Sequence, residues 1–146
     1  MREILFRGKA INRNKGEHRT KYKNGDWVYG LVTRLYDERF ESLPAEMANT
    51  DGVNGIDVDY KTIGQYTGLT DKNGKKIFEG DILKGCYDED NPEEYTVVVV
   101  FWDNGWRIQQ DNRIPDPLEE YDGRICEVIG NIHDNPELLK GGEEND

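Results

Sequence analysis

Ile63–Lys84, with the sequence IGQYTGLTDKNGKKIFEGDILK, is the most regular stretch of this 146-residue chain. Apolar and aromatic residues flank a polar turn at Asp71–Lys75. Within that turn, Asn73-Gly74 favours a type I′ hairpin, because both residues tolerate the positive φ that this turn demands. Glu79-Gly80-Asp81 then interrupts the apolar run before it resumes at Ile82, and a glycine inside a strand pattern is typical of a bulge or bend. The stretch therefore predicts a hairpin that leads into a strongly bent sheet.

The same stretch resembles the YopX-like proteins of bacteriophages and prophages. Three more segments resemble that family: REILFRGKA (Arg2–Ala10), GDWVYG (Gly25–Gly30) and VIGNIHDNPELL (Val128–Leu139). The resemblance implies a mainly β fold, an SH3-like small barrel in the C-terminal part, and a phage or prophage origin. It implies no activity and no catalytic residue, because none is established for the family.

Runs of apolar, β-branched and aromatic residues predict the remaining strands. These strands are expected at Arg2–Gly8, Trp27–Tyr36, Tyr95–Trp102, Trp106–Gln110 and Arg124–Ile132. In the first strand, Ile4 and Phe6 are expected on one face. The continuous apolar run that ends at Trp102 predicts burial on both faces, or at least a central position in a sheet. Leu43–Ala48 predicts one helical turn that begins with Pro44, and Asn135–Leu139 predicts a short helix capped by Asn135.

These elements predict a mainly β protein in three parts. Residues 1–61 form an N-terminal β-hairpin segment and its connection to the rest of the chain. Residues 62–140 form an SH3-like β-barrel domain with a short C-terminal helix. Residues 141–146 form an acidic tail, which we expect to be disordered because it is terminal and strongly charged.

The formal net charge of −11 is unevenly distributed. Residues 1–40 contain ten Lys/Arg and five Asp/Glu, a net charge of +5, whereas residues 41–146 contain nine and twenty-five, a net charge of −16. The acidic residues 41–146 repel the phosphate backbone of a nucleic acid, so their charge disfavours nucleic-acid binding by most of the chain.

The basic N-terminal segment is the exception. Its candidate phosphate contacts are Arg13, Lys15, Arg19, Lys21 and Lys23, with the Tyr22 ring available to stack on a base. The alternative is a solvated loop tip, where polar residues collect without any specific role.

A second candidate site is an aromatic groove for a protein partner. Trp102 and Trp106 flank the tight turn Asp103-Asn104-Gly105, and Tyr66 is a third aromatic residue that would line the groove. The alternative is that these rings pack in the core, since aromatic pairs beside hairpin turns also stabilise the sheet itself.

Two groups of carboxylates are candidates for a divalent metal. Asp57 and Asp59 point to one side of a strand, and the segment from Asp88 to Glu94 is rich in acidic residues. The alternatives are the outward face of an edge strand and a solvated loop, and the spacing in the acidic segment does not fit an EF-hand. We expect no metal and no cofactor.

The sequence contains no recognisable catalytic motif. His18 and His133 are the only histidines, and neither has the neighbours of a triad or a metal site. There is no glycine-rich phosphate loop and no nucleophile elbow. We therefore expect a non-enzymatic interaction module that binds a protein partner or itself, with a homo-oligomer as the expected state.

The expected location is the cytoplasm of a bacterial host, with no membrane contact. The first residues are charged and lack the apolar region of a signal peptide, and no apolar run approaches the length that spans a membrane. Cys86 and Cys126 lack the CxxC spacing of a zinc or redox site, so we expect two buried, reduced side chains.

Overall fold

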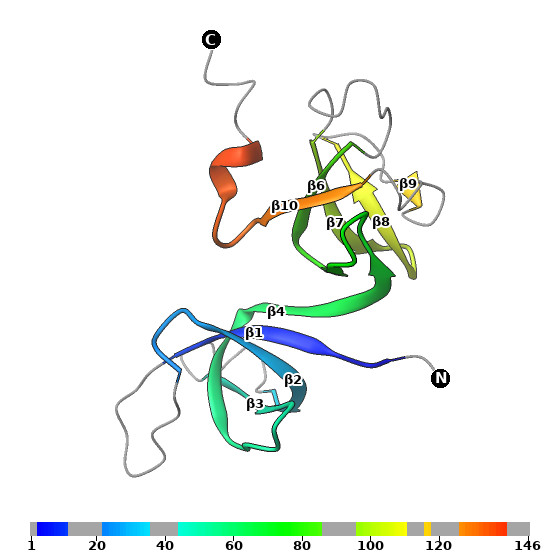
Figure 1. Ribbon diagram of the computed structural model, residues 1–146. Helices are drawn as coiled ribbons and strands as arrows, with labels where there is room; N and C mark the ends of the chain where they lie inside the picture. The colour runs from blue at the N-terminus through cyan, green and yellow to red at the C-terminus, as the bar shows by residue number, and fades with distance from the viewer. Residues whose placement is uncertain are drawn as a thin grey trace. The chain divides into compact units, whose positions relative to one another are not determined.

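The computed structural model describes residues 3–11, 22–35, 44–85, 96–110, 116–117 and 126–139. Strands dominate these ranges, which confirms the mainly β class (Figure 1). The chain divides into two compact units, Met1–Gln65 and Tyr66–Asp146, whereas the sequence placed the boundary between residues 61 and 62. The long strand β4 (Ile56–Thr70) continues from the first unit into the second. Residues 141–146, the predicted tail, lie outside the described ranges.

Four strands close on themselves in the first unit. Besides the start of β4, they are β1 (Phe6–Ala10), β2 (Trp27–Arg34) and β3 (Ala45–Asn49), all paired antiparallel in the order β1-β2-β3-β4. Because β4 also pairs with β1, each of these strands has a neighbour on both sides. Closure of this kind removes free strand edges. The enclosed core consists of Ala10, Val28, Ala45, Met47, Ile56 and Val58.

The helical turn predicted at Leu43–Ala48 is wrong, because the described part of this segment belongs to β3. Ala45 and Met47 are buried and alternate with the more exposed Glu46 and Ala48, which is the period of a strand. Strands β2 and β4 bond to β3 from both sides, and this pairing overrides the local preference that Pro44 suggested.

The prediction that Ile4 and Phe6 share one face is also wrong. The strand begins at Phe6, and Ile4 is exposed while its neighbour Leu5 is buried. Phe6, in contrast, packs against the core. A Cβ added at Gly8 would lie 3.1 Å from the Met47 sulfur, so this position also faces inward.

The second unit contains a five-stranded antiparallel sheet in the order β10-β6-β7-β8-β9. Its strands are β6 (Asp81–Lys84), β7 (Thr96–Trp102), β8 (Gly105–Gln109), β9 (Asp116–Pro117) and β10 (Glu127–Asn131). The predicted central position of the apolar run is confirmed, because β7 is the middle strand. Burial on both faces is not, since Val97 and Val99 are buried whereas Val98 and Val100 are only partly buried. The core beneath this sheet consists of Ile77, Leu83, Val97, Val99, Ile108 and Cys126. The SH3-like detail of the barrel stays a prediction.

The end of β4 and β5 (Lys76–Phe78) form the predicted hairpin, but its turn is not type I′. Gly74 has a φ of 79°, whereas Asn73 has no positive φ. The Gly74 N–H donates to the Asp71 carbonyl at 3.0 Å, and the Asp71 N–H donates to the Lys75 carbonyl at 2.8 Å. This pattern is a type I turn followed by a glycine bulge. The Asp71 carboxylate favours it by accepting the N–H groups of Asn73 and Lys75.

The second predicted hairpin, between β7 and β8, does have the type I′ form. Asp103 and Asn104 have φ values of 50° and 60°, and Trp102 pairs with Gly105 across them. The predicted bend at Gly80 is also confirmed, since Gly80 has a φ of 89° between β5 and β6.

The predicted C-terminal helix is present as one 3₁₀ segment, η3 (Pro136–Leu139). Cys126 is buried as expected, but it is disulfide-bonded, so the prediction of a reduced side chain is wrong at this position. The missing CxxC spacing argued against a zinc site and was silent on a bond to a distant cysteine. Cys86 lies outside the described ranges.

Candidate functional site

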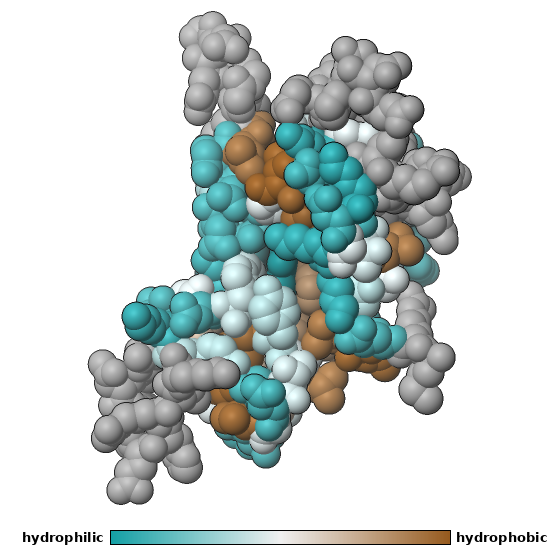
Figure 2. All heavy atoms as spheres, viewed as in Figure 1, coloured by the Kyte–Doolittle hydropathy of each residue, from teal (hydrophilic) through white to brown (hydrophobic). Residues whose placement is uncertain are grey.

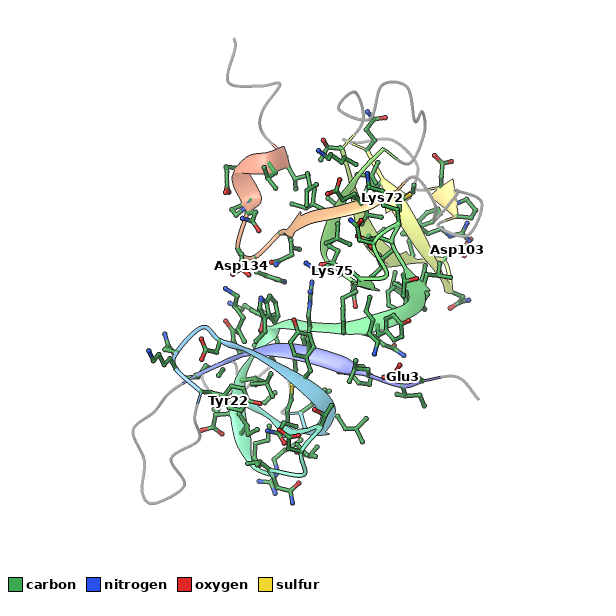
Figure 3. All side chains as sticks on the ribbon, viewed as in Figure 1. Glu3, Tyr22, Lys72, Lys75, Asp103 and Asp134 are labelled. Carbon is green, nitrogen blue, oxygen red and sulfur yellow. The ribbon has the colours of Figure 1, made fainter. Side chains whose placement is uncertain are left out.

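Among the described residues of the second unit, the most exposed aromatic side chains lie at the tip of the β7–β8 hairpin. Phe101 and Trp102 are the last residues of β7, and they are 55% and 48% exposed. Because successive side chains of a strand point to opposite faces, the two rings lie on opposite sides of the hairpin. Figure 3 labels Asp103, which follows them in the turn.

The Phe101 ring packs against the ring of Trp106. It pairs with Trp106 across the hairpin, and the two rings meet edge to face with centroids 5.0 Å apart. Trp106 is partly buried and packs against the core of the second unit. The next inward pair, Val99 and Ile108, is fully buried. Phe101 is thus the outer end of a column of packed side chains, which fixes its position.

Trp102 lies beside a basic side chain on the other face. Its partner across the hairpin is Gly105, which has no side chain to cover the ring. Arg107 fills this space: its Nε donates to the Trp102 carbonyl at 3.3 Å, and its guanidinium lies 3.6 Å from where a Cβ of Gly105 would be. The hairpin tip therefore presents the Phe101 ring on one face, and the Trp102 ring and the Arg107 side chain on the other.

The groove predicted from Trp102, Trp106 and Tyr66 is not assembled in this form. The register places Trp102 and Trp106 on opposite faces of the hairpin. Tyr66 is only 8% exposed, and its ring lies 5.7 Å from that of Phe78. Phe101 was missed by the sequence reasoning, although a two-residue turn at Asp103-Asn104 would have paired it with Trp106.

The basic loop is largely beyond what the structure describes. Arg13, Lys15, Arg19 and Lys21 lie outside the described ranges. Lys23 is exposed, and its backbone N–H donates to the Asp26 carboxylate at 2.9 Å.

Tyr22, which was predicted as a ring that could stack on a base, packs inside the first unit. It packs against the core, and its hydroxyl accepts a hydrogen bond from the Asn49 side-chain amide at 3.0 Å. Figure 3 labels Tyr22. A ring held in this way supports the fold of the first unit and is not positioned as a free platform for a base.

The acidic candidates do not form a metal site in the described structure. Asp57 and Asp59 alternate with the buried Ile56 and Val58 as expected, but their strand is paired on both sides and is not an edge. The Asp59 carboxylate accepts the Lys61 N–H at 3.0 Å. Within the described ranges, no three His, Cys, Asp or Glu side chains are grouped to hold a metal ion. Residues 88–94 lie outside those ranges.

Asp71 is a buried carboxylate whose partners are backbone N–H groups. Its Oδ1 accepts from Asn73 at 2.8 Å and from Lys75 at 2.9 Å, and its Oδ2 accepts from Val128 at 2.9 Å. Burial is the largest single influence and raises the pKa of Asp71. The three N–H donors and the nearby Lys75 charge together outweigh it and hold the pKa below the ordinary value. Asp71 therefore stays ionised at neutral pH, where it ties chain segments together.

A second apolar group lies at the C-terminal end of the described chain. Figure 2 shows apolar side chains near η3 within a largely hydrophilic surface, and the exposed residues there are Ile132, Leu138 and Leu139. None of these residues is aromatic, and η3 buries none of its own side chains.

Comparison with known proteins gives a family and a fold. The model of the family described as YopX protein matches residues 9–140. The crystal structure of protein EF1440 from Enterococcus faecalis is similar over 95% of this chain and 99% of its own, with a TM-score of 0.57. At 22% sequence identity this likeness shows the fold alone. No curated protein matches the chain. Among the described residues, no helix is long and apolar enough to cross a membrane.

Proposed function

Since the chain belongs to the YopX protein family, we propose that it is a non-enzymatic interaction module of phage or prophage origin, which binds a protein partner or a second copy of itself. The observation that carries this proposal is the exposure of Phe101 and Trp102 at the β7–β8 hairpin tip. Exposed aromatic rings on a fixed support are typical of binding surfaces, because their burial against a partner releases water from a large apolar area.

The composition of the tip supports the proposal. Trp and Arg are the residues that most often dominate the energy of a protein interface, and here Trp102 lies beside Arg107. The type I′ turn and the Phe101–Trp106 contact hold the tip in one geometry. A rigid surface loses little conformational entropy on binding, so more of the contact energy is available for affinity.

Charge bears on the choice between a partner and a second copy. Residues 66–146 contain eight Lys/Arg and twenty Asp/Glu, a net charge of −12. Two copies that meet through their second units bring like charges together, so added salt would strengthen that contact by screening. A basic partner would show the opposite dependence on salt.

Strand edges, in contrast, give little support to self-association. The described strands of the first unit close on themselves, and β9 at one edge of the second sheet has two residues. A short edge offers few backbone groups to a second chain. The main support for binding therefore comes from the exposed rings of Phe101 and Trp102.

The bacterial cytoplasm as the site of action is a further part of the proposal. Disulfides are uncommon in cytosolic proteins, so the bond at Cys126 counts against this location. Fractionation of host cells that express the chain tests it: recovery from the periplasm or the medium contradicts this part of the proposal.

Nucleic-acid binding through the basic N-terminal segment is the second candidate. The net charge of +5 over residues 1–40 and the exposed Lys23 favour it. Such binding would depend on phosphate contacts and weaken steeply as salt rises.

One experiment separates the two candidates. The mass of the purified protein in solution is measured by light scattering, with and without a short DNA duplex, at low and moderate salt. An oligomer that is indifferent to DNA and dissociates in a Phe101→Ser/Trp102→Ser variant supports the interaction module. A monomer whose mass rises with DNA at low salt supports the second candidate.

A further inference from the structure

The outer edge of β10 is covered by the turn between β4 and β5. One edge of β10 bonds to β6, with Glu127 opposite Lys84 and Val128 opposite Leu83. On the other edge, the Val128 N–H donates to the Asp71 carboxylate at 2.9 Å, and the Cys126 carbonyl accepts the Lys72 N–H at 2.9 Å. Figure 3 labels Lys72. Residues 126 and 128 have the same parity, so both bonds lie on the side of the strand that faces away from β6.

The far end of β10 is covered by a second turn. The Asn131 N–H donates to the Asn135 side-chain oxygen at 3.2 Å, and the Asn131 carbonyl accepts the Asn135 N–H at 2.8 Å. The Asn131 side-chain oxygen holds this turn in place by accepting the N–H groups of His133 and Asp134. Both backbone groups of Asn131 are therefore occupied.

Gly130 shows that the second cover is built into the strand. A Cβ added at Gly130 would lie 2.5 Å from the Asn135 side-chain oxygen and 2.8 Å from its amide carbon. Both distances are too short for a real contact, so a larger residue at this position would push the Asn135 side chain away from β10. The two turns have the sequences TDKNGK and GNIHDNP.

We propose that these turns form an edge plug, which keeps β10 from pairing with the β10 of a second copy. A strand edge is a template for strand addition, and the same edge on a second copy offers complementary N–H and C=O groups in the antiparallel sense. The sequence of β10, EVIGN, has one charge and adjacent β-branched residues, which favours such pairing once the edge is open. The plug goes beyond the proposed function, because it acts at β10 and not at the hairpin tip.

Substitution of Asp71 tests the edge plug most directly. It accepts two N–H groups of its own turn and one from β10, so its loss releases the turn and the strand edge together. Asp71→Ala removes all three contacts. Gly130→Ala leaves Asp71 in place and displaces Asn135 instead, so the two variants open different ends of the same edge.

The experiment follows the mass of the full chain by light scattering over rising protein concentration, and the exchange of single amide hydrogens by NMR. In dilute Asp71→Ala, the Val128 amide is expected to exchange about tenfold faster than in the wild type, or more. At high concentration its mass is expected to rise to twice that of the wild type, with renewed protection at Val128. Gly130→Ala is expected to raise exchange at Asn131 and to self-associate in the same way.

Val99→Ala is the matched control, since it destabilises the core of the second unit without touching the plug. It is expected to keep the mass of the wild type, and any loss of amide protection is expected across the whole second unit and not at Val128 in particular. The proposal is overturned if either plug variant folds and keeps the wild-type mass at every concentration. It is equally overturned if Val99→Ala self-associates as strongly, because general instability would then explain the result. Asp71→Ala and Gly130→Ala are expected to self-associate through β10. Adding Phe101→Ser/Trp102→Ser to either variant should therefore leave its self-association unchanged.

Discussion

Asp71 and Val128 are 57 positions apart in the sequence, and the Asp71 Oδ2 accepts the Val128 N–H at 2.9 Å. This contact joins the turn of one hairpin to a strand near the end of the chain. The Lys72 N–H reinforces it by donating to the Cys126 carbonyl. Because a buried carboxylate must be fully hydrogen-bonded to be tolerated, the turn and the strand depend on each other.

Replacement of Asp71 by Asn is expected to lower the free energy of unfolding by about 1–3 kcal/mol at neutral pH, since charge-assisted hydrogen bonds are replaced by weaker ones. Asp71 is 5% exposed, so water cannot substitute for the lost contacts. Urea denaturation at pH 7 measures the difference. Asp59→Asn is the control, because Asp59 accepts the N–H of the nearby Lys61 and ties no distant segment. A loss as large in the control would contradict the assigned role of Asp71.

The same carboxylate predicts a dependence of stability on acid. The pKa of Asp71 is lower in the folded state than its ordinary value, so the ionised form stabilises the fold above the unfolded-state pKa. This stabilisation is lost as the pH falls through the folded-state pKa, that is, below about pH 4. Denaturation curves measured from neutral to acidic pH should therefore converge for the wild type and Asp71→Asn. A difference that stays constant down to the lowest pH would show that the carboxylate charge is not the cause.

Gly30→Ala is expected to disrupt the first unit. A Cβ at Gly30 would lie 1.9 Å from the Ala48 carbonyl oxygen, a backbone atom that β2–β3 pairing holds in place. Forcing the strands apart should lower the free energy of unfolding by about 3 kcal/mol or more. Gly105→Ala is the comparison, because its nearest contact, at 3.6 Å, is to the flexible Arg107 side chain. Thermal denaturation should rank Gly30→Ala well below Gly105→Ala, and equal transition temperatures would contradict the close approach of β2 and β3.

Most strands were predictable because alternation and apolar runs directly reflect burial, whereas β3 was expected as a helical turn. The β7 run and the bend at Gly80 needed no knowledge of distant residues. The turn at Asn73-Gly74 was misjudged for a physical reason: the dipeptide favours type I′, but the Asp71 carboxylate selects a type I turn through two N–H groups. The type I′ geometry appears at Asp103-Asn104, where no such side chain intervenes among the described contacts.

The candidate site was harder to predict, because it depends on register. Sequence spacing grouped Trp102 with Trp106, whereas pairing across the hairpin groups Phe101 with Trp106 and leaves Trp102 on the other face. The hydrogen bonds that cover the outer edge of β10 could not be predicted either, because they join residues that are far apart in the sequence. Nothing local to Asp71 indicates that its second oxygen binds a strand that begins at Glu127.

The basic segment gives a prediction for nucleic acid. If Arg13, Lys15, Arg19, Lys21 and Lys23 contact phosphates, replacing all five by Glu should abolish binding to a short DNA duplex at low salt. Fluorescence anisotropy with labelled DNA, at two salt concentrations, measures this. A variant of the second unit with Lys72, Lys75 and Lys76 replaced by Glu is the control for negative charge added elsewhere in the chain. Unchanged affinity in the five-residue variant, or an equal loss in the control, removes the nucleic-acid hypothesis.

The hairpin tip gives the prediction that tests the proposed function most directly. Phe101→Ser/Trp102→Ser should shift the equilibrium of an oligomer toward monomer by about tenfold or more, since each ring would otherwise bury apolar area worth about 1.5–3 kcal/mol. Sedimentation over a range of concentrations measures the dissociation constant. Leu69→Ser is the control, because Leu69 is exposed in the same unit but lies outside the hairpin. Salt then identifies the contact: association between two second units, each with a net charge of −12, should tighten as salt rises. An oligomer that is unaffected by the double variant would place the interface elsewhere and leave the hairpin tip without a role in self-association.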